Sequence, residues 1–91
     1  MRILIVDDHA LVRRGMNYVV KEGFPDAEVI EAESSAAALE ALRSTGKVDL
    51  ALVDVRMPDL DGLELLRAIK AEWEDMPVIM LSTYENAPYV K

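Results

Sequence analysis

Acidic and hydroxyl side chains directly follow three apolar stretches of this sequence, at residues 3–6, 50–53 and 78–81. The acids are Asp7, Asp8 and Asp54, and the hydroxyls are Ser82 and Thr83. Carboxyl ends of parallel strands meet at one sheet edge, where ligands bind in open α/β folds. Three carboxylates close together repel one another unless a hard cation with oxygen ligands occupies the site. The pattern therefore predicts a Mg²⁺ site, since Mg²⁺ takes one or two carboxylates and keeps positions for water and phosphoryl oxygens.

Each of these residues also has a plainer explanation. Asp8 is suitably placed to cap a following helix, and Asp54 could simply form a turn. Ser82 and Thr83, taken singly, are typical loop hydroxyls. Their common position at one edge of one predicted sheet is what favours a functional site.

The elements that position these residues alternate along the chain. The runs 3–6, 50–53 and 78–81 are continuously apolar, which is typical of strands covered on both faces in a parallel sheet. A fourth candidate strand, residues 27–32, contains Glu28 and Glu31 and is expected nearer a sheet edge. The alternation of strand and helix predicts a doubly wound sheet with right-handed crossovers.

Three stretches between the predicted strands have helical spacing. The first covers residues 10–21 and carries one apolar stripe, whose members are Leu11, Val12, Met16, Val19 and Val20. Ser34 or Ser35 is expected to cap the second, which stops near Gly46. Asp61 and Glu64 have capping-box spacing at the start of the third, and Trp73 is expected in the core at its end. Pro88 falls in the first turn of a possible fourth helix.

Composition and charge restrict the class of protein. The chain has 91 residues, with 17 acids, 10 bases, no cysteine and an apolar share of 52%, as expected of one small globular domain. A formal charge of −7 opposes contact with nucleic acid. The lack of cysteine fits a reducing compartment, so a cytoplasmic location is expected. The short apolar start meets Asp7 and Asp8, so neither a signal peptide nor a membrane anchor is predicted.

Three motifs together resemble the receiver domain of two-component response regulators. They are Ile3-Leu4-Ile5-Val6-Asp7-Asp8-His9, Leu52-Val53-Asp54-Val55-Arg56-Met57-Pro58-Asp59-Leu60-Asp61-Gly62 and Val78-Ile79-Met80-Leu81-Ser82-Thr83. The resemblance covers the whole chain in order and spacing. The stretch from Asp7 to Gly15 further resembles receivers of the LuxR/NarL type, which precede a helix-turn-helix domain.

The resemblance implies a role for each residue of the site. Asp54 would accept a phosphoryl group from a histidine kinase, and Ser82 would be the switch hydroxyl that bonds to it. Asp8 and Asp54 would contact Mg²⁺ directly, Asp7 would do so through water, and the backbone carbonyl of Arg56 would complete the protein ligands. The protein would be a signalling switch rather than an enzyme acting on a separate metabolite, and any DNA binding would belong to a C-terminal domain outside this segment.

The sequence departs from the family pattern at its end. Lys91 lies only nine residues past Ser82, before the fifth strand, the fifth helix and the family's phosphoryl-pairing Lys. We therefore expect residues 1–91 to form the N-terminal portion of a receiver, with a flavodoxin-like, CheY-like doubly wound parallel sheet that is incomplete at about four strands. An unpaired fourth strand favours a homodimer or a domain-swapped association. A truncated receiver acting only as an interaction module is the alternative function.

Other residues near the acids have different expected roles, and two other classes of protein disagree with the sequence. His9 is expected to be a solvent-facing loop residue rather than a metal ligand or phosphodonor, and Arg13 and Arg14 are expected on the exposed face of the first helix. Arg56 and Tyr84 would overhang the pocket and tune access of water. An aspartyl-phosphate enzyme of the haloacid-dehalogenase type would need a second Asp two residues after Asp54, where this chain has Arg56. A flavin binder of the flavodoxin type would have Gly, Ser and Thr where this chain has Asp-Asp-His.

Overall fold

The computed structural model describes residues 1–55 and 62–81, which form four strands and three helices in strict alternation. The elements are β1 (Arg2–Val6), α1 (Ala10–Gly23), β2 (Glu28–Ala32), α2 (Ser35–Thr45), β3 (Leu50–Asp54), α3 (Gly62–Glu72) and β4 (Val78–Leu81). All strand pairs are parallel, in the order β2-β1-β3-β4. This is the predicted doubly wound sheet, with the first four places of the flavodoxin-like order filled.

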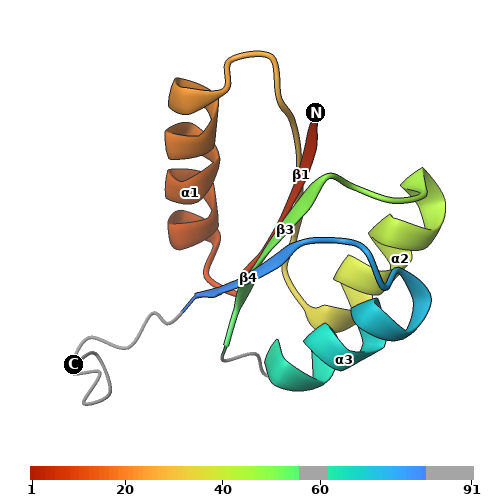
Figure 1. Ribbon diagram of the computed structural model, residues 1–91. Helices are drawn as coiled ribbons and strands as arrows, with labels where there is room; N and C mark the ends of the chain where they lie inside the picture. The colour runs from red at the N-terminus through yellow and green to blue at the C-terminus, as the bar shows by residue number, and fades with distance from the viewer. Residues whose placement is uncertain (56–61, 82–91) are drawn as a thin grey trace, which may run out of the picture.

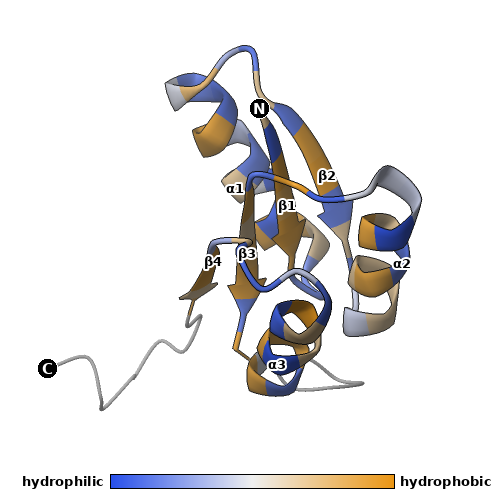
Figure 2. Cartoon of the chain, turned by 45° about the vertical axis from the view of Figure 1, so that its right-hand side comes forward, coloured by the Kyte–Doolittle hydropathy of each residue, from blue (hydrophilic) through white to orange (hydrophobic). Residues whose placement is uncertain are grey.

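The helices cover the two faces of the sheet unequally. Figure 1 shows α1 alone on one face, with α2 and α3 together on the other. Figure 2 shows hydrophobic colour along the strands between these layers. The larger core lies beneath α2 and α3 and joins strand residues such as Leu4 and Val53 to Leu42, Leu65 and Ile69. Each fully buried Leu, Ile or Val side chain contributes about 2 kcal/mol, so this side supplies most of the stabilising burial.

The strand patterns follow the order of the sheet. The four apolar residues of β1 are all buried, because β1 lies between two neighbours and both of its faces are covered. In contrast, β2 is at an edge and keeps its glutamates at the surface. The sequence-based placement of β2 near an edge is thereby confirmed.

The apolar stripe predicted for α1 is only partly packed. Met16 and Val20 lie against the smaller core, which includes Ile3 and Ile5. Leu11 and Val19 are 85% and 68% exposed, and α1 has no buried residue. The rest of the stripe is exposed because α1 stands alone on its face of the described sheet (Figure 1).

The ends of α2 agree with the sequence signals. Ser34 is the N-cap, and its side chain accepts a hydrogen bond from the backbone N–H of Ala37. Gly46 follows the helix at a φ of 86°, a conformation that favours glycine. The Asp61 half of the capping box predicted for α3 lies outside the described residues. Trp73 follows α3 and packs, partly buried, on the larger core as expected.

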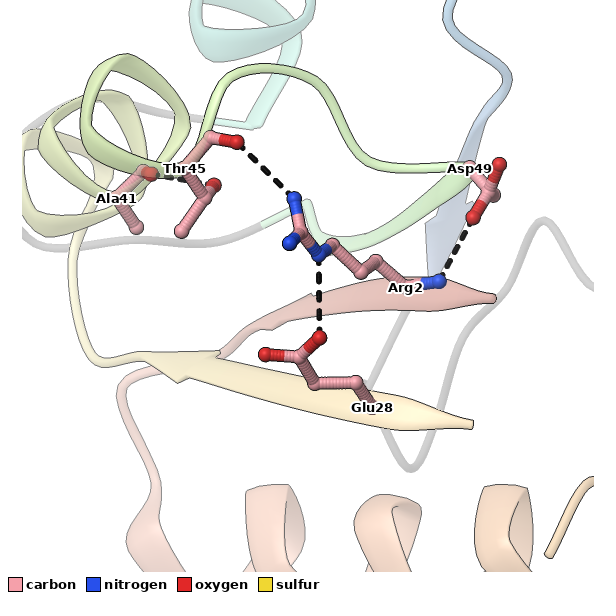
Figure 3. A network of polar contacts seen from close by, with 5 residues as sticks. All are labelled: Arg2, Glu28, Ala41, Thr45 and Asp49. Atoms are coloured by element: carbon pink, nitrogen blue, oxygen red, sulfur yellow. Dashed lines mark hydrogen bonds and ion pairs between the residues drawn. The ribbon is translucent and has the colours of Figure 1, made fainter. Parts of the chain in front are cut away.

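A polar network ties together the amino ends of β1 and β2 (Figure 3). The backbone N–H of Arg2 donates to Asp49 Oδ2 over 2.7 Å, and its Nε donates to Glu28 Oε1 over 3.1 Å. Its Nη1 donates to the carbonyl of Thr45, at the end of α2, over 3.0 Å. Arg2 therefore links β1 to β2, to the end of α2 and to the residue before β3. These contacts lie at the amino ends of the strands, opposite the end that carries the acids.

Among the helices of the described ranges, none combines the length and apolarity needed to cross a bilayer.

Candidate functional site

Three predicted acids meet at the carboxyl ends of β1 and β3. The strands are neighbours in register, with Val6 opposite Val53, so the acids that follow or end them share one edge of the sheet. Asp7, Asp8, His9 and Asp54 each offer a ligand atom, and these atoms all lie within 4.8 Å of one another. The convergence of the carboxylates predicted from the sequence is confirmed.

Asp7 is fully buried, and only one of its two carboxylate oxygens has a hydrogen-bond partner among the described residues. Its Oδ1 accepts a hydrogen bond from the backbone N–H of His9 over 2.8 Å. Its Oδ2 is buried and has no hydrogen-bond partner among the described residues. A buried carboxylate oxygen left in this way is costly, and a nearby carboxylate adds repulsion. The clustered carboxylate oxygens are suitable ligands for a hard divalent cation, which would offset both the cost of burial and the repulsion between the carboxylates.

Asp54 ends β3 and is buried at 1% exposure. The next residue, Val55, donates its backbone N–H to the carbonyl of Leu81 and accepts a bond from the N–H of Gly62, both over 2.8 Å. A Cβ on Gly62 would collide with the backbone oxygen of Asp54 and come within 2.8 Å of Val55 Cα and Met80 Cε. The lack of a side chain at Gly62 lets α3 begin directly against the strand end that carries Asp54.

Asp8 has a different role from the cap that its position allowed. The helix begins at Ala10, and His9 is its N-cap residue, without a side-chain cap hydrogen bond. The Asp8 side chain is 30% exposed, with Oδ1 lying 3.1 Å from His9 Nδ1. Asp8 thus presents a carboxylate to the mouth of the cluster. The capping explanation is wrong for this chain.

Arg13 was expected on the exposed face of α1, but its side chain is only 13% exposed. Nη1 donates to the backbone carbonyl of Asp7 over 2.6 Å, and Nε donates to Glu31 Oε1 over 2.9 Å. Arg14 alone keeps the predicted exposure. Sequence reasoning missed this contact. The available signal was the position of Arg13 one turn into the helix that follows the acids, together with an acid in the adjacent edge strand.

Glu31 is the acid of that edge strand, and its environment favours the charged form. A hydrogen bond from the Asn17 side chain, over 2.7 Å, is the main cause that holds the pKa of Glu31 below its usual range. Partial burial opposes this shift, while the hydrogen bond and charge of Arg13 and the charge of Arg14 assist it. The result is a charged, bonded link from β2 through α1 to the backbone of Asp7.

Several predicted site residues lie outside the described residues. These are Arg56, Ser82, Thr83 and Tyr84. Their expected roles as carbonyl ligand, switch hydroxyl and access residues stay predictions.

An open apolar groove of about 470 Å³ lies away from the acids, between α1 and the strands beside it. Its lining residues are Val12, Gly15, Met16, Val19, Val20, Leu52 and Leu81. All the lining residues within the described ranges are uncharged. The groove marks the face that α1 leaves uncovered.

Comparison with known proteins agrees with this geometry. Residues 3–91 match the family model described as response regulator receiver domain. A chemotaxis protein CheY homolog of Campylobacter jejuni is 38% identical over 86 residues, which are 91% of this chain. The transcriptional regulatory protein YdfI of Bacillus subtilis is 37% identical over 85 residues, or 93% of the chain. The chain spans 65% of the length of the first relative and 39% of the second.

Solved structures of a Thermotoga maritima protein, TrrA, are also similar. The response regulator TrrA in complex with Mg²⁺-BeF superposes with a TM-score of 0.83 at 33% identity, over 92% of this chain and 70% of that one. TrrA in complex with the histidine kinase ThkA gives a TM-score of 0.81 at 32% identity, over 94% of this chain and 72% of that one. The similarity in sequence and in fold therefore extends over almost all of this chain.

Proposed function

The chain belongs to the response regulator receiver domain family, and from this premise we propose that Asp54 accepts a phosphoryl group from a histidine kinase. The observation that carries the proposal is the meeting of Asp7, Asp8 and Asp54 at one sheet edge, with ligand atoms within 4.8 Å. Asp54 ends the strand at the centre of this cluster and is held against β4 and α3 by the backbone bonds of Val55. The switch would act as a signalling component and not as an enzyme on a separate metabolite.

The three acids would coordinate Mg²⁺ together, Asp8 and Asp54 as direct ligands and Asp7 through a water molecule. The backbone carbonyl of Arg56 would supply a further ligand. The bound ion would neutralise charge on the phosphoryl group during transfer. The half-satisfied, buried carboxylate of Asp7 supports this assignment, as does the Mg²⁺-BeF complex of TrrA.

The remaining roles belong to residues next to the described strand ends. Ser82 directly follows β4 in the sequence, so its hydroxyl would reach the phosphoryl oxygens and turn phosphorylation into a shift between two conformations. Arg56 and Tyr84 would limit the access of water and so set the lifetime of the acyl phosphate. These roles rest on the family motif and on the chain positions.

The partners and output are proposed on the same basis. A histidine kinase is the expected phosphodonor, since TrrA forms a complex with one. Control of transcription is the expected output, through a LuxR/NarL-type DNA-binding domain outside this segment; the similarity to YdfI, a transcriptional regulatory protein, supports this. The net charge of −7 disfavours nucleic-acid contact by this segment. We place the protein in the cytoplasm.

We further propose that this segment, taken alone, associates with itself through β4. In the described sheet β4 pairs with β3 on one side only, and Ile79 in β4 is 48% exposed. An open apolar edge is a template for strand pairing or element exchange. Light scattering at high micromolar concentration should show a dimer or larger species, and a clean monomer would refute the association.

The phosphoacceptor proposal is tested by intact mass after incubation with acetyl phosphate and Mg²⁺. Wild type should gain the mass of one phosphoryl group, and the gain should disappear in Asp54→Asn and in the presence of EDTA. Asp75→Asn, which changes an exposed acid, is the matched control and should react as wild type does. No gain in a folded sample that binds Mg²⁺ would refute phosphoacceptance by this segment and favour the alternative of an interaction module.

A further inference from the structure

His9 lies at ligand distance from the acids, although its side chain is 64% exposed. Its Nδ1 is 3.1 Å from Asp8 Oδ1 and 3.4 Å from Asp7 Oδ1. Two ligand atoms on one tetrahedral Zn²⁺, each at about 2.0–2.1 Å from the metal, are about 3.3 Å apart. The distance from His9 Nδ1 to each of the two oxygens is therefore close to that between two ligands of a single ion.

The backbone fixes His9 in this position. Its N–H donates to Asp7 Oδ1 over 2.8 Å, and its carbonyl accepts the N–H of Arg13 over 2.9 Å as the first bond of α1. Only the two side-chain torsions remain free. Because the imidazole faces solvent, an ion can arrive without any opening of the fold, and little ordering of the ligand is needed on binding.

Imidazole changes the kind of ion that the cluster prefers. Carboxylates alone suit hard ions such as Mg²⁺, whereas a neutral imidazole nitrogen suits Zn²⁺, Ni²⁺ and Cu²⁺. The buried Oδ2 of Asp7 has no hydrogen-bond partner among the described residues, and a bound cation would stabilise it. We propose that His9 makes the acid pocket a mixed nitrogen and oxygen site for a borderline divalent ion such as Zn²⁺, which competes there with Mg²⁺.

This inference rests on the proposed divalent-ion pocket, but it can fail independently of phosphoryl transfer. If it holds, His9 recruits the borderline ion and contributes nothing to Mg²⁺ binding. A gain in affinity of about tenfold for Zn²⁺ is expected from one added ligand, equal to about 1.4 kcal/mol. A histidine that merely pairs with the acids would leave the choice of ion unchanged.

The sequence makes the test direct, because the chain has a single histidine and no cysteine. In a tag-free sample the imidazole NMR signals all belong to His9. One equivalent of Zn²⁺ should shift its ring nitrogen and carbon resonances, while saturating Mg²⁺ should leave them near their metal-free positions. Ring resonances that respond alike to both ions, or to neither, would overturn the proposal.

Calorimetric titration of variants provides the second arm. His9→Asn keeps a favourable N-cap residue and should lose about tenfold in Zn²⁺ affinity, with Mg²⁺ affinity within twofold of wild type. Asp54→Asn should lower the affinity for both ions, because they are proposed to share one pocket. An equal loss for both ions in His9→Asn would overturn the inference. If wild type binds Mg²⁺ and is phosphorylated but the His9 ring resonances do not respond to Zn²⁺, only this inference fails. If neither ion binds, the proposed function fails with it.

Discussion

Arg13 holds the backbone of Asp7, since its Nη1 donates to the Asp7 carbonyl oxygen over 2.6 Å. The same guanidinium bonds to Glu31 in the edge strand. A residue one turn into α1 thereby joins β2 to the strand end from which the acids project. The position of Asp7 depends on this side chain as well as on the sheet.

Replacing Arg13 should weaken ion binding without removing any ligand. Arg13→Met should lower Mg²⁺ affinity by about tenfold, the effect expected when a residue that supports a ligand is lost, and should reduce stability by about 1–2 kcal/mol. Calorimetric titration with Mg²⁺ and urea unfolding measure the two effects. Arg14→Met is the control on the exposed face of the same helix. Equal Mg²⁺ affinities for the two variants would contradict the positioning role of Arg13.

Removing the charge of Asp7 should stabilise the metal-free protein while abolishing its response to metal. Asp7→Asn keeps an oxygen that can accept the His9 N–H bond and removes a buried carboxylate beside other acids. We expect a gain on the order of 1–3 kcal/mol at pH 7. Urea unfolding with and without Mg²⁺ measures it.

The exposed acid Asp26 provides the control for that experiment. Asp26→Asn should leave both the metal-free stability and the stabilisation by Mg²⁺ near their wild-type values. A loss of stability in metal-free Asp7→Asn would show that the buried charge of Asp7 and its repulsion by nearby acids do not destabilise the folded protein.

An added methyl group should lower the stability of the protein at Gly62 and raise it at Gly15. Gly62→Ala places a Cβ against the backbone oxygen of Asp54 and the backbone of Val55, so it should cost about 1–3 kcal/mol through overpacking. Gly15→Ala, inside α1, meets nothing within 4 Å among the described residues and should stabilise by about 0.5–1 kcal/mol. Thermal unfolding of both variants checks the pair. Parallel shifts would contradict the steric account of Gly62.

Acid should weaken the link between α1 and β2. The folded pKa of Glu31 is lowered, mainly by the Asn17 hydrogen bond, so its stabilising effect is present above the ordinary value of 4.5. The effect is lost as the pH falls from 4.5 through the folded pKa, because the unfolded chain takes up the proton more readily. Asn17→Ala should raise the pKa of Glu31 and show a smaller loss of stability over this range.

Carbon-detected NMR titration of the Glu31 carboxyl group, with urea midpoints at pH 6 and below pH 4.5, measures both quantities. Lys47→Ala, at an exposed position, is a control whose acid sensitivity should match that of wild type. An unchanged Glu31 pKa in Asn17→Ala would contradict the assigned cause.

The fold was predictable because its signals are local. Continuous apolarity of residues 3–6 and 50–53 indicates strands with two covered faces. The described sheet buries the apolar residues of β1 fully, whereas Leu50 and Leu52 of β3 are only partly buried. Capping by Ser34 and the stop at Gly46 follow from side-chain and backbone chemistry within a few residues. The spacing of acids after strands also predicted the cluster, since parallel strands bring their carboxyl ends to one edge.

Only the tertiary structure could decide which neighbours those residues meet. Helical periodicity marked Leu11, Met16 and Val19 alike, yet burial depends on what covers α1, and only Met16 of the three packs on the core. Arg13 looked like a surface cation in sequence because its partners, the Asp7 carbonyl and Glu31, come from two other elements. The elements, their order and the presence of an acid pocket follow from patterns within the sequence. The approach of Asp54 to Asp7 and the support from Arg13 come from the tertiary structure, because these contacts join elements that are separate along the chain.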